Sequence, residues 1–168
     1  MKAGDLVLTA DGRAVPVLWL GEQLVKKRIG QVPEALQPVC IQAGALGNHS
    51  DLRVTADHGM IVDGLVINAG ALVNGDTITW ATTATPYTVY HIETPAHEVI
   101  LANGAMAETF IDAVERRAFD NYAEYLDLCD VDRIIPEMSR PRISSARLVP
   151  QAVKDRLQNV PPKVKLSA

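Results

Sequence analysis

Four polar side chains in two short segments have the chemistry needed for proton transfer. Thr55 and His58 lie in a stretch that reads Arg-Val-Thr-Ala-Asp-His, and His91 and His97 lie in a stretch that reads Tyr-His-Ile-Glu-Thr-Pro-Ala-His. An imidazole has an ordinary pKa of about 6.5, so a histidine can accept and donate a proton near neutral pH. The pattern therefore predicts general acid–base chemistry, with Thr55, His58, His91 and His97 as the candidate catalytic residues.

A metal site is the alternative use of these histidines. They would converge on an ion together with an acidic residue, and the candidate ligands are His58, His91, His97, Glu93 and Glu98. A zinc site needs three or four ligands with further hydrogen-bonded support. The sequence has no His-x-x-x-His or Cys-x-x-Cys spacing. We therefore expect no metal ion and no organic cofactor.

Short β-strands must position these residues, because apolar runs bounded by turn signals fill the first 110 positions. The expected strands cover residues 5–9, 15–20, 39–41, 52–55, 60–62, 65–68, 77–80, 86–93, 98–102 and 106–110. Asp11-Gly12, Asp63-Gly64 and Asn103-Gly104 are turn dipeptides that favour tight hairpins. In residues 86–93, Tyr87, Val89 and His91 are expected to face one side of the strand.

Other features of this half interrupt or fill the β structure. A break is expected from Gly21 to Pro33, and short helical turns are expected at 33–37 and 69–73. Trp19 and Trp80 lie in strand-like runs, where large aromatic side chains usually belong to the core. Both are therefore expected to be buried.

The composition changes near Asp112, and the remaining chain is expected to be helical and extended. A helix is predicted over 113–128, with Asp112 as its N-cap and Glu115 completing the capping box. Its apolar positions 114, 119, 122 and 126 would pack on the β part. A second helix is predicted over 150–159, after an extended proline-containing stretch from 136 to 150. Residues 1–110 and 111–168 are thus expected to be a β domain and a C-terminal extension.

Several segments, taken in order, resemble the Hint family, the self-processing domains of inteins and hedgehog proteins, and in particular its bacterial subgroup. They are residues 4–7, 52–62, 89–104, 120–124 and 141–150. The resemblance implies a mostly β fold, a Hint-type horseshoe of short strands with a C-terminal helical extension. It also implies an N–S or N–O acyl shift, with self-cleavage of an upstream polypeptide in cis. Thr55 and His58 would then surround the scissile amide, and His91 would stand where inteins commonly have Asp.

The sequence also departs from the family pattern. Hint domains open on a nucleophilic Cys or Ser and a first strand, whereas this sequence opens Met-Lys-Ala-Gly-Asp. Cys40 and Cys129 cannot substitute, since the reaction needs the thiol on the residue that follows the scissile bond. No Asn follows Gly104 in the manner of an intein's last residue. The sequence as given is therefore expected to be inactive unless the nucleophile lies upstream. The alternative is a decayed Hint domain kept as a structural or binding module of a secreted protein.

Charge and hydropathy limit the partners. The net charge is −4 and no basic patch offers a phosphate-binding surface, so nucleic acid is not expected. No run approaches the roughly 20 apolar residues of a membrane span, and the first residues lack the apolar run of a signal peptide, so no export signal is expected if Met1 is the true start. The expected location is cytoplasmic as given, or secreted or at the surface if the chain is part of a longer protein. A sheet edge left open by the missing strand predicts a homodimer.

Overall fold

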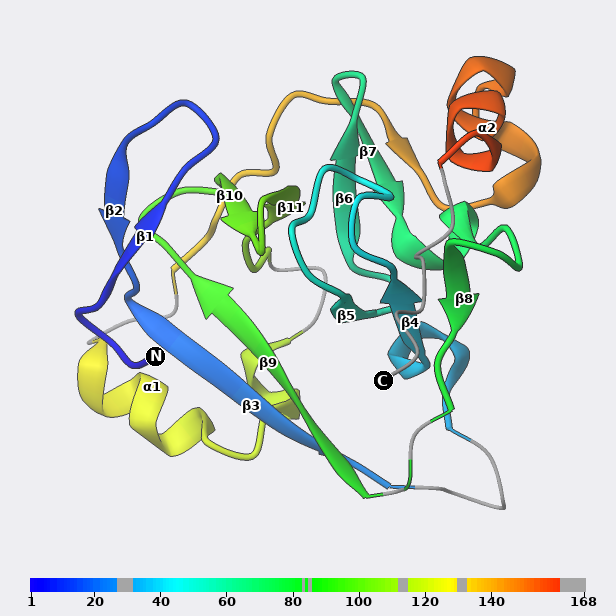
Figure 1. The fold of residues 1–168 in the computed structure, drawn as a ribbon. Coiled ribbons are helices and arrows are strands. Elements are labelled where there is room, and N and C mark those ends of the chain that lie inside the picture. The colour runs from blue at the N-terminus through cyan, green and yellow to red at the C-terminus, as the bar shows by residue number, and fades with distance from the viewer. Residues whose placement is uncertain (27–31, 83, 85, 112–114, 130–132, 161–168) are drawn as a thin grey trace, which may run out of the picture. The chain divides into compact units, whose positions relative to one another are not determined.

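The computed structural model describes residues 1–26, 32–82, 84, 86–111, 115–129 and 133–160. It consists mostly of β-strands in several small sheets, with two short α-helices near the C-terminus (Figure 1). The prediction of a mostly β chain is confirmed. Within the described residues, neither helix has the length and apolar character needed to cross a membrane.

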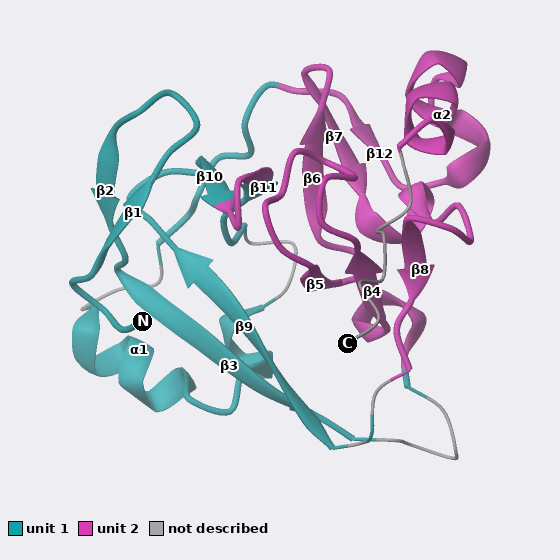
Figure 2. Ribbon diagram, in the orientation of Figure 1, with its two compact units in different colours: residues 1–32, 84–101, 107–139 teal, residues 33–83, 102–106, 140–168 magenta. Residues whose placement is uncertain are grey.

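The chain divides into two compact units, each assembled from three separate segments (Figure 2). Unit 1 contains residues 1–32, 84–101 and 107–139. Unit 2 contains residues 33–83, 102–106 and 140–168. Each unit therefore combines residues from the family-like β part with residues from the C-terminal part.

Unit 1 is built on two antiparallel strand pairs. β1 (Leu6–Leu8) pairs with β2 (Ala14–Pro16) across the Asp-Gly turn, and Gly12 has a φ of 86°. β3 (Trp19–Val25) pairs along its whole length with β9 (Tyr87–Glu93). β10 (Val99–Ala102) and β11 (Ala105–Glu108) follow β9 in the chain, and residues 102–106, which include the turn between them, are assigned to unit 2.

The predicted break at Gly21 is wrong, because β3 runs through this residue. Gly21 lies opposite His91 in the β3–β9 pair. A Cβ atom added at Gly21 would lie 2.9 Å from the rings of both Phe119 and Trp19. Glycine is present because two aromatic rings lie directly on the strand, a close approach that a larger residue would block.

An aromatic core fills unit 1 beside β3. It contains Trp19, Phe110, Phe119, Tyr125 and Ile135, all nearly or fully buried. The rings of Trp19 and Phe119 meet edge to face at 5.2 Å between centroids, and those of Trp19 and Tyr125 at 5.3 Å. Contacts of this geometry add stability to that given by the buried area. The expectation that Trp19 belongs to the core is confirmed.

The predicted continuous helix over 113–128 is also wrong. The described part contains a 3₁₀ turn, η3 (Arg116–Ala118), and a shorter helix, α1 (Tyr122–Leu128), while residues 112–114 and the expected cap lie outside the described residues. Asp120 and Asn121 interrupt the helix because they bond to the edge of β3. The Asn121 amide accepts from the Glu22 N–H and donates to the Leu20 carbonyl, both at 2.8 Å.

Unit 2 contains two small sheets and the remaining helix. β4 (Pro38–Ile41) lies between β5 (Leu52–Thr55) and β8 (Ile78–Trp80), antiparallel to both. β6 (Gly59–Val62) and β7 (Leu65–Asn68) form a hairpin, and β12 (Arg142–Ile143) adds to β7 in parallel. The 3₁₀ turns are η1 (Glu34–Leu36), η2 (Ala69–Leu72) and η4 (Ala146–Leu148), and the helix is α2 (Gln151–Gln158).

Most of the predicted elements of unit 2 are confirmed, and their turn residues explain why. Asp63 and Gly64 have φ values of 51° and 79°, and Asn103 and Gly104 have φ values of 51° and 95°. Two successive positive φ angles are what a two-residue hairpin turn requires, and Asn-Gly and Asp-Gly supply them at low cost. The helical turns expected at 33–37 and 69–73 and the helix expected at 150–159 are present within about a residue.

Candidate functional site

The link between β5 and β6 in unit 2 holds two of the four candidate residues. β5 ends at Thr55 and β6 begins at Gly59, which leaves Ala56, Asp57 and His58 in the turn. The Thr55 hydroxyl is buried and donates to the Asp57 carboxylate at 2.7 Å. Because a hydroxyl has one proton to give, its remaining capacity is that of an acceptor.

The backbone of this turn is tied to its surroundings on both sides. The N–H groups of Ala56 and Asp57 donate to the carbonyls of Gln37 and Ala35, at 2.9 and 3.2 Å. The His58 N–H donates to the Thr55 carbonyl at 3.1 Å, and the His58 carbonyl accepts from the Ala69 N–H at 2.9 Å. The half-buried His58 side chain is therefore carried by a backbone with little freedom to move, as a preorganised catalytic group requires.

His97 in unit 1 is held through both of its ring nitrogens. Nε2 lies 3.1 Å from a Glu108 carboxylate oxygen, and Nδ1 accepts the backbone N–H of Met138 at 3.0 Å. Since a backbone N–H can only donate, Nδ1 carries no proton in this arrangement, and the Nε2 proton points to the carboxylate. The geometry thus assigns a neutral imidazole in the Nε2–H tautomer. The side chains of His97 and Glu108 are 1% and 7% exposed, so solvent screens this contact little.

His91 belongs to the aromatic part of unit 1. Its ring meets Phe119 edge to face at 5.1 Å between centroids and Phe110 at 6.3 Å. This position follows from β9, where His91 faces the same side as Val89 and Tyr87 in the predicted alternation. Its surroundings are therefore mainly those of a core residue.

Two residues along the strand, a buried ion pair lies on the same face. Glu93 is fully buried, and its carboxylate meets Arg116 Nε at 2.8 Å and Arg133 Nη1 at 3.5 Å. The Arg116 guanidinium also lies over the Phe110 and Tyr125 rings, 5.0 and 4.8 Å from their centroids. Sequence reasoning considered Glu93 only as a metal ligand. The strand alternation that turns Glu93 inward was visible, but its arginine partners are 23 and 40 residues away.

The Tyr125 hydroxyl is part of the same cluster. It accepts a hydrogen bond from the Arg133 backbone N–H at 3.1 Å. Burial raises the pKa of this hydroxyl, an effect that the Arg133 hydrogen bond and the nearby Arg116 charge partly oppose. The cluster therefore has the character of a stabilising network in which charges are paired in a low-dielectric interior.

The candidate residues thus have different surroundings. Thr55 and His58 share one turn of unit 2, and His91 and His97 have separate partners in unit 1. The joint catalytic assignment of the four stays a prediction. Cys40 and Cys129 form no disulfide and are both half-buried. Over the part of the chain that the structure describes, no group of three His, Cys, Asp or Glu side chains could hold a metal ion.

A Hint domain family model matches residues 1–114, which is more than half of the chain. The chain therefore belongs to the Hint domain family. No curated protein matches, and no solved structure does. The match includes all four candidate residues, together with the partners Asp57 and Glu108.

Proposed function

We propose that this Hint domain is an autoprocessing domain, which cleaves a peptide bond at a Cys or Ser that lies upstream of residue 1. Two observations support the proposal. The chain belongs to the Hint family over residues 1–114, and Thr55 and His58 lie on a turn whose backbone is fixed by hydrogen bonds. The rigid turn carries the proposal furthest, because catalysis of an amide rearrangement depends on groups held in place beforehand.

The chemistry assigned to the turn is an N–S or N–O acyl shift. A thiol or hydroxyl on the residue after the scissile bond attacks the preceding carbonyl carbon, so a C–S or C–O bond forms as the C–N bond breaks. His58 donates a proton to the departing amide nitrogen, which becomes an amine, and the proton released by the thiol or hydroxyl returns to His58. Thr55 accepts a hydrogen bond from the same amide, since its own proton goes to Asp57. Water or an added thiol then attacks the resulting ester or thioester and releases the upstream polypeptide.

The surroundings of Cys40 do not suit the role of nucleophile in this scheme. Cys40 lies in the middle of β4, with Arg53 opposite on one side and Thr79 on the other. The backbone at Cys40 is paired with β5 on one side and with β8 on the other. This pairing opposes the twisting of the peptide bond that an acyl shift requires. The proposal therefore assigns the nucleophile to the upstream junction, and it assigns His91 and His97 supporting roles in proton transfer.

A second candidate function is that of a structural or binding module. The contacts of His97 favour it, because both ring nitrogens are already engaged by Glu108 and Met138. A base that must exchange protons with a substrate would need one of them released. In this second proposal His91 and His97 stabilise unit 1, and no peptide bond is cleaved.

Intact-mass spectrometry separates the two functions. The chain is expressed together with its natural upstream codons and purified with and without an added thiol. Autoprocessing predicts a shortened product that begins at a Cys or Ser, with an upstream fragment whose release the thiol accelerates. A single uncleaved mass under both conditions would contradict autoprocessing and support the structural module.

A further inference from the structure

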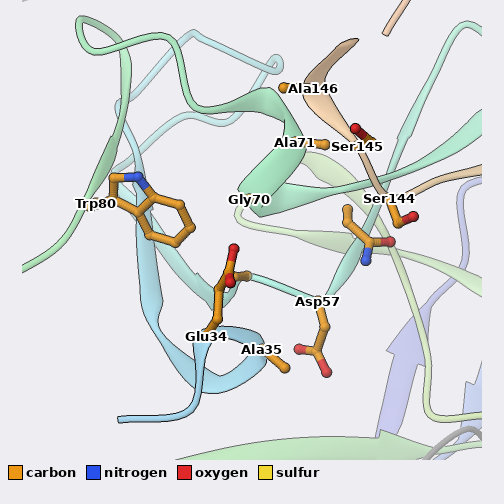
Figure 3. Close-up of a pocket in the computed structure, with 11 residues that line it drawn as sticks. Glu34, Ala35, Asp57, Gly70, Ala71, Trp80, Ser144, Ser145 and Ala146 are labelled. Atoms are coloured by element: carbon orange, nitrogen blue, oxygen red, sulfur yellow. The ribbon is translucent and has the colours of Figure 1, made fainter. Parts of the chain in front are cut away.

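Unit 2 contains a pocket whose lining shares Ala56 and Asp57 with the Thr55–His58 turn and otherwise comes from residues given no role so far. Its volume is about 450 Å³, within the range of about 300–1,000 Å³ that is usual for small-molecule sites. The residues that matter for its chemistry are Glu34, Asp57, Asn68, Gly70 and Trp80 (Figure 3). They come from η1, the β5–β6 turn, the end of β7, η2 and the end of β8, which all belong to the same compact unit.

Trp80 gives the pocket an aromatic wall. The expectation that Trp80 is buried in the core is wrong, since 45% of this residue is exposed. A Cβ atom on Gly70 would lie 3.3 Å from the Trp80 ring, 3.1 Å from the Ala56 Cβ and 3.2 Å from the Ala56 carbonyl oxygen. The small residues at 56 and 70 therefore allow the indole to lie against η2, while part of its surface stays open to solvent.

The charge of the pocket is negative. Among the described residues that line it, the charged side chains are the carboxylates of Glu34 and Asp57. Figure 3 shows the Glu34 carboxylate pointing into the space beside the Trp80 ring, whereas Asp57 points toward Ala35. Arg142 donates to the side-chain oxygen of Asn68 at 3.4 Å and does not itself line the pocket. Two carboxylates in the lining give a field that favours a cation.

We propose that this pocket binds an organic cation, namely the ammonium group of a lysine side chain or the guanidinium of an arginine on a polypeptide. An open indole attracts such a group through its π face, and a neighbouring carboxylate forms a charge-assisted hydrogen bond with it. An indole face beside a carboxylate suits an organic cation better than it suits a metal ion. Over the described residues no third His, Cys, Asp or Glu joins the two carboxylates as a ligand.

This assignment does not rest on autoprocessing. Asp57 is shared with the Thr55–His58 turn, so a basic side chain in the pocket would lie close to that turn. The quantity that tests the pocket is binding, and it can be measured on a chain that cleaves nothing. Failure of cleavage and failure of binding are therefore separate results.

The test is a titration of the ¹⁵N-labelled protein followed by NMR. The two tryptophans give separate indole N–H signals, and Trp80→Phe identifies the signal of Trp80. The probes are N-acetyl-lysine methylamide and N-acetyl-arginine methylamide, with neutral N-acetyl-norleucine methylamide as control. Tetramethylammonium tests whether a cation without a peptide is sufficient. We expect saturable shifts of Trp80, Gly70 and Ala71 with one or both basic probes, at dissociation constants on the order of 1 mM, and weaker binding at higher salt.

Variants assign the binding to its residues. Glu34→Gln should raise the dissociation constant of the lysine probe by about two- to fivefold. Asp57→Asn should raise it by less, because Asp57 points away from the indole. Trp80→Leu should raise the same dissociation constant by about threefold or more. Glu115→Gln removes an exposed carboxylate in unit 1 and should leave the constant unchanged.

Three results would overturn the proposal. One is the absence of a saturable shift with either basic probe. The second is equal binding of the norleucine probe, which would make the site apolar. The third is stronger binding of tetramethylammonium than of both peptide-borne probes, which would assign the pocket to a free quaternary amine.

Discussion

At the scale of single residues, His97 shows how a catalytic residue type can also act as a structural one. Its two nitrogens are bonded to Glu108 and to the Met138 backbone, and the ring is almost fully buried. Removing the ring would leave the Glu108 carboxylate buried without this partner, and the loss of a buried partner costs more than the net value of the bond itself.

We expect His97→Ala to lower the free energy of unfolding by about 2–4 kcal/mol. Glu108→Gln should cost about 1 kcal/mol, since its amide oxygen can still accept from Nε2. Urea denaturation measures both values, and a long-range ¹⁵N spectrum should show the proton on Nε2. An Nδ1–H tautomer, or equal stability of His97→Ala and the unsubstituted protein, would contradict the geometry.

The residue scale is also where sequence reasoning reached its limit. Thr55, His58, His91 and His97 were recognised from local motifs, whereas Glu108 and Met138 lie 11 and 41 residues from the histidine they hold. Local periodicity carries no information about pairings over such separations. For the same reason, the arginine partners of Glu93 could not be predicted.

At the scale of elements, the edge of β3 depends on side chains that follow η3. Asn121 bonds to the backbone of Glu22 and Leu20, and the Asp120 carboxylate accepts the Leu24 N–H. These bonds replace the partner strand that an exposed edge would otherwise recruit. The predicted homodimer therefore has less free backbone to use at this edge, and it stays a prediction.

Asn121→Ala should open this edge. We expect a loss of about 1–2 kcal/mol from the two side-chain hydrogen bonds to β3 and the exposed one to Glu124, with faster hydrogen exchange of the Glu22 amide. Asn159→Ala removes a single side-chain bond to the Asp155 carbonyl in α2 and should leave Glu22 unchanged. Unaltered exchange at Glu22 in Asn121→Ala would show that the side chain does not protect the strand.

The β1–β2 turn should respond to acid through Asp11. Hydrogen bonds from the Thr9 hydroxyl and from Arg13 lower the pKa of Asp11 from 3.8 to about 2. A carboxyl whose folded pKa is depressed stabilises the fold above its unfolded pKa, and the contribution is lost as the pH falls from about 4 toward 2. A ¹³C NMR titration should give a midpoint near 2, and Thr9→Val should move it upward. A midpoint near 3.8 in the unsubstituted protein would contradict these bonds.

Elements were predicted well wherever their signals are local. The Asp-Gly and Asn-Gly turns fixed the hairpins at Asp63 and Asn103, and alternation placed β9. The predictions failed where distant groups decide the outcome. Gly21 reads as a break but makes room for Phe119, and the helical pattern before Tyr122 gives way to bonds with β3.

At the scale of the whole molecule, both compact units need residues beyond the family match. Residues 115–129 and 133–139 supply Phe119, Tyr125 and Ile135 to the aromatic core of unit 1. Residues 140–160 supply β12 and α2 to unit 2, where Val153 and Leu157 are buried. The part after residue 114 therefore completes both cores.

A chain that ends at residue 114 should fail to fold stably. It would lose three members of the aromatic core, and deleting even one large aromatic side chain typically costs about 3–5 kcal/mol, a large part of a domain's total stability. Near-UV circular dichroism and ¹⁵N NMR spectra of residues 1–114 and of residues 1–168 compare the folding of the two chains. Dispersed, native-like signals from the shorter chain would contradict this account.

The measurement that tests the central claim most directly compares two histidine substitutions in the chain expressed with its natural upstream codons. His58→Ala removes the proposed proton donor, and His49→Ala removes an exposed imidazole elsewhere in unit 2. The rate of thiol-dependent cleavage is followed by intact mass. We predict that His58→Ala slows cleavage by about 10²–10⁴-fold and that His49→Ala leaves it unchanged. Equal rates in the two variants, or no cleavage in the unsubstituted chain, would contradict the proposed role of the Thr55–His58 turn.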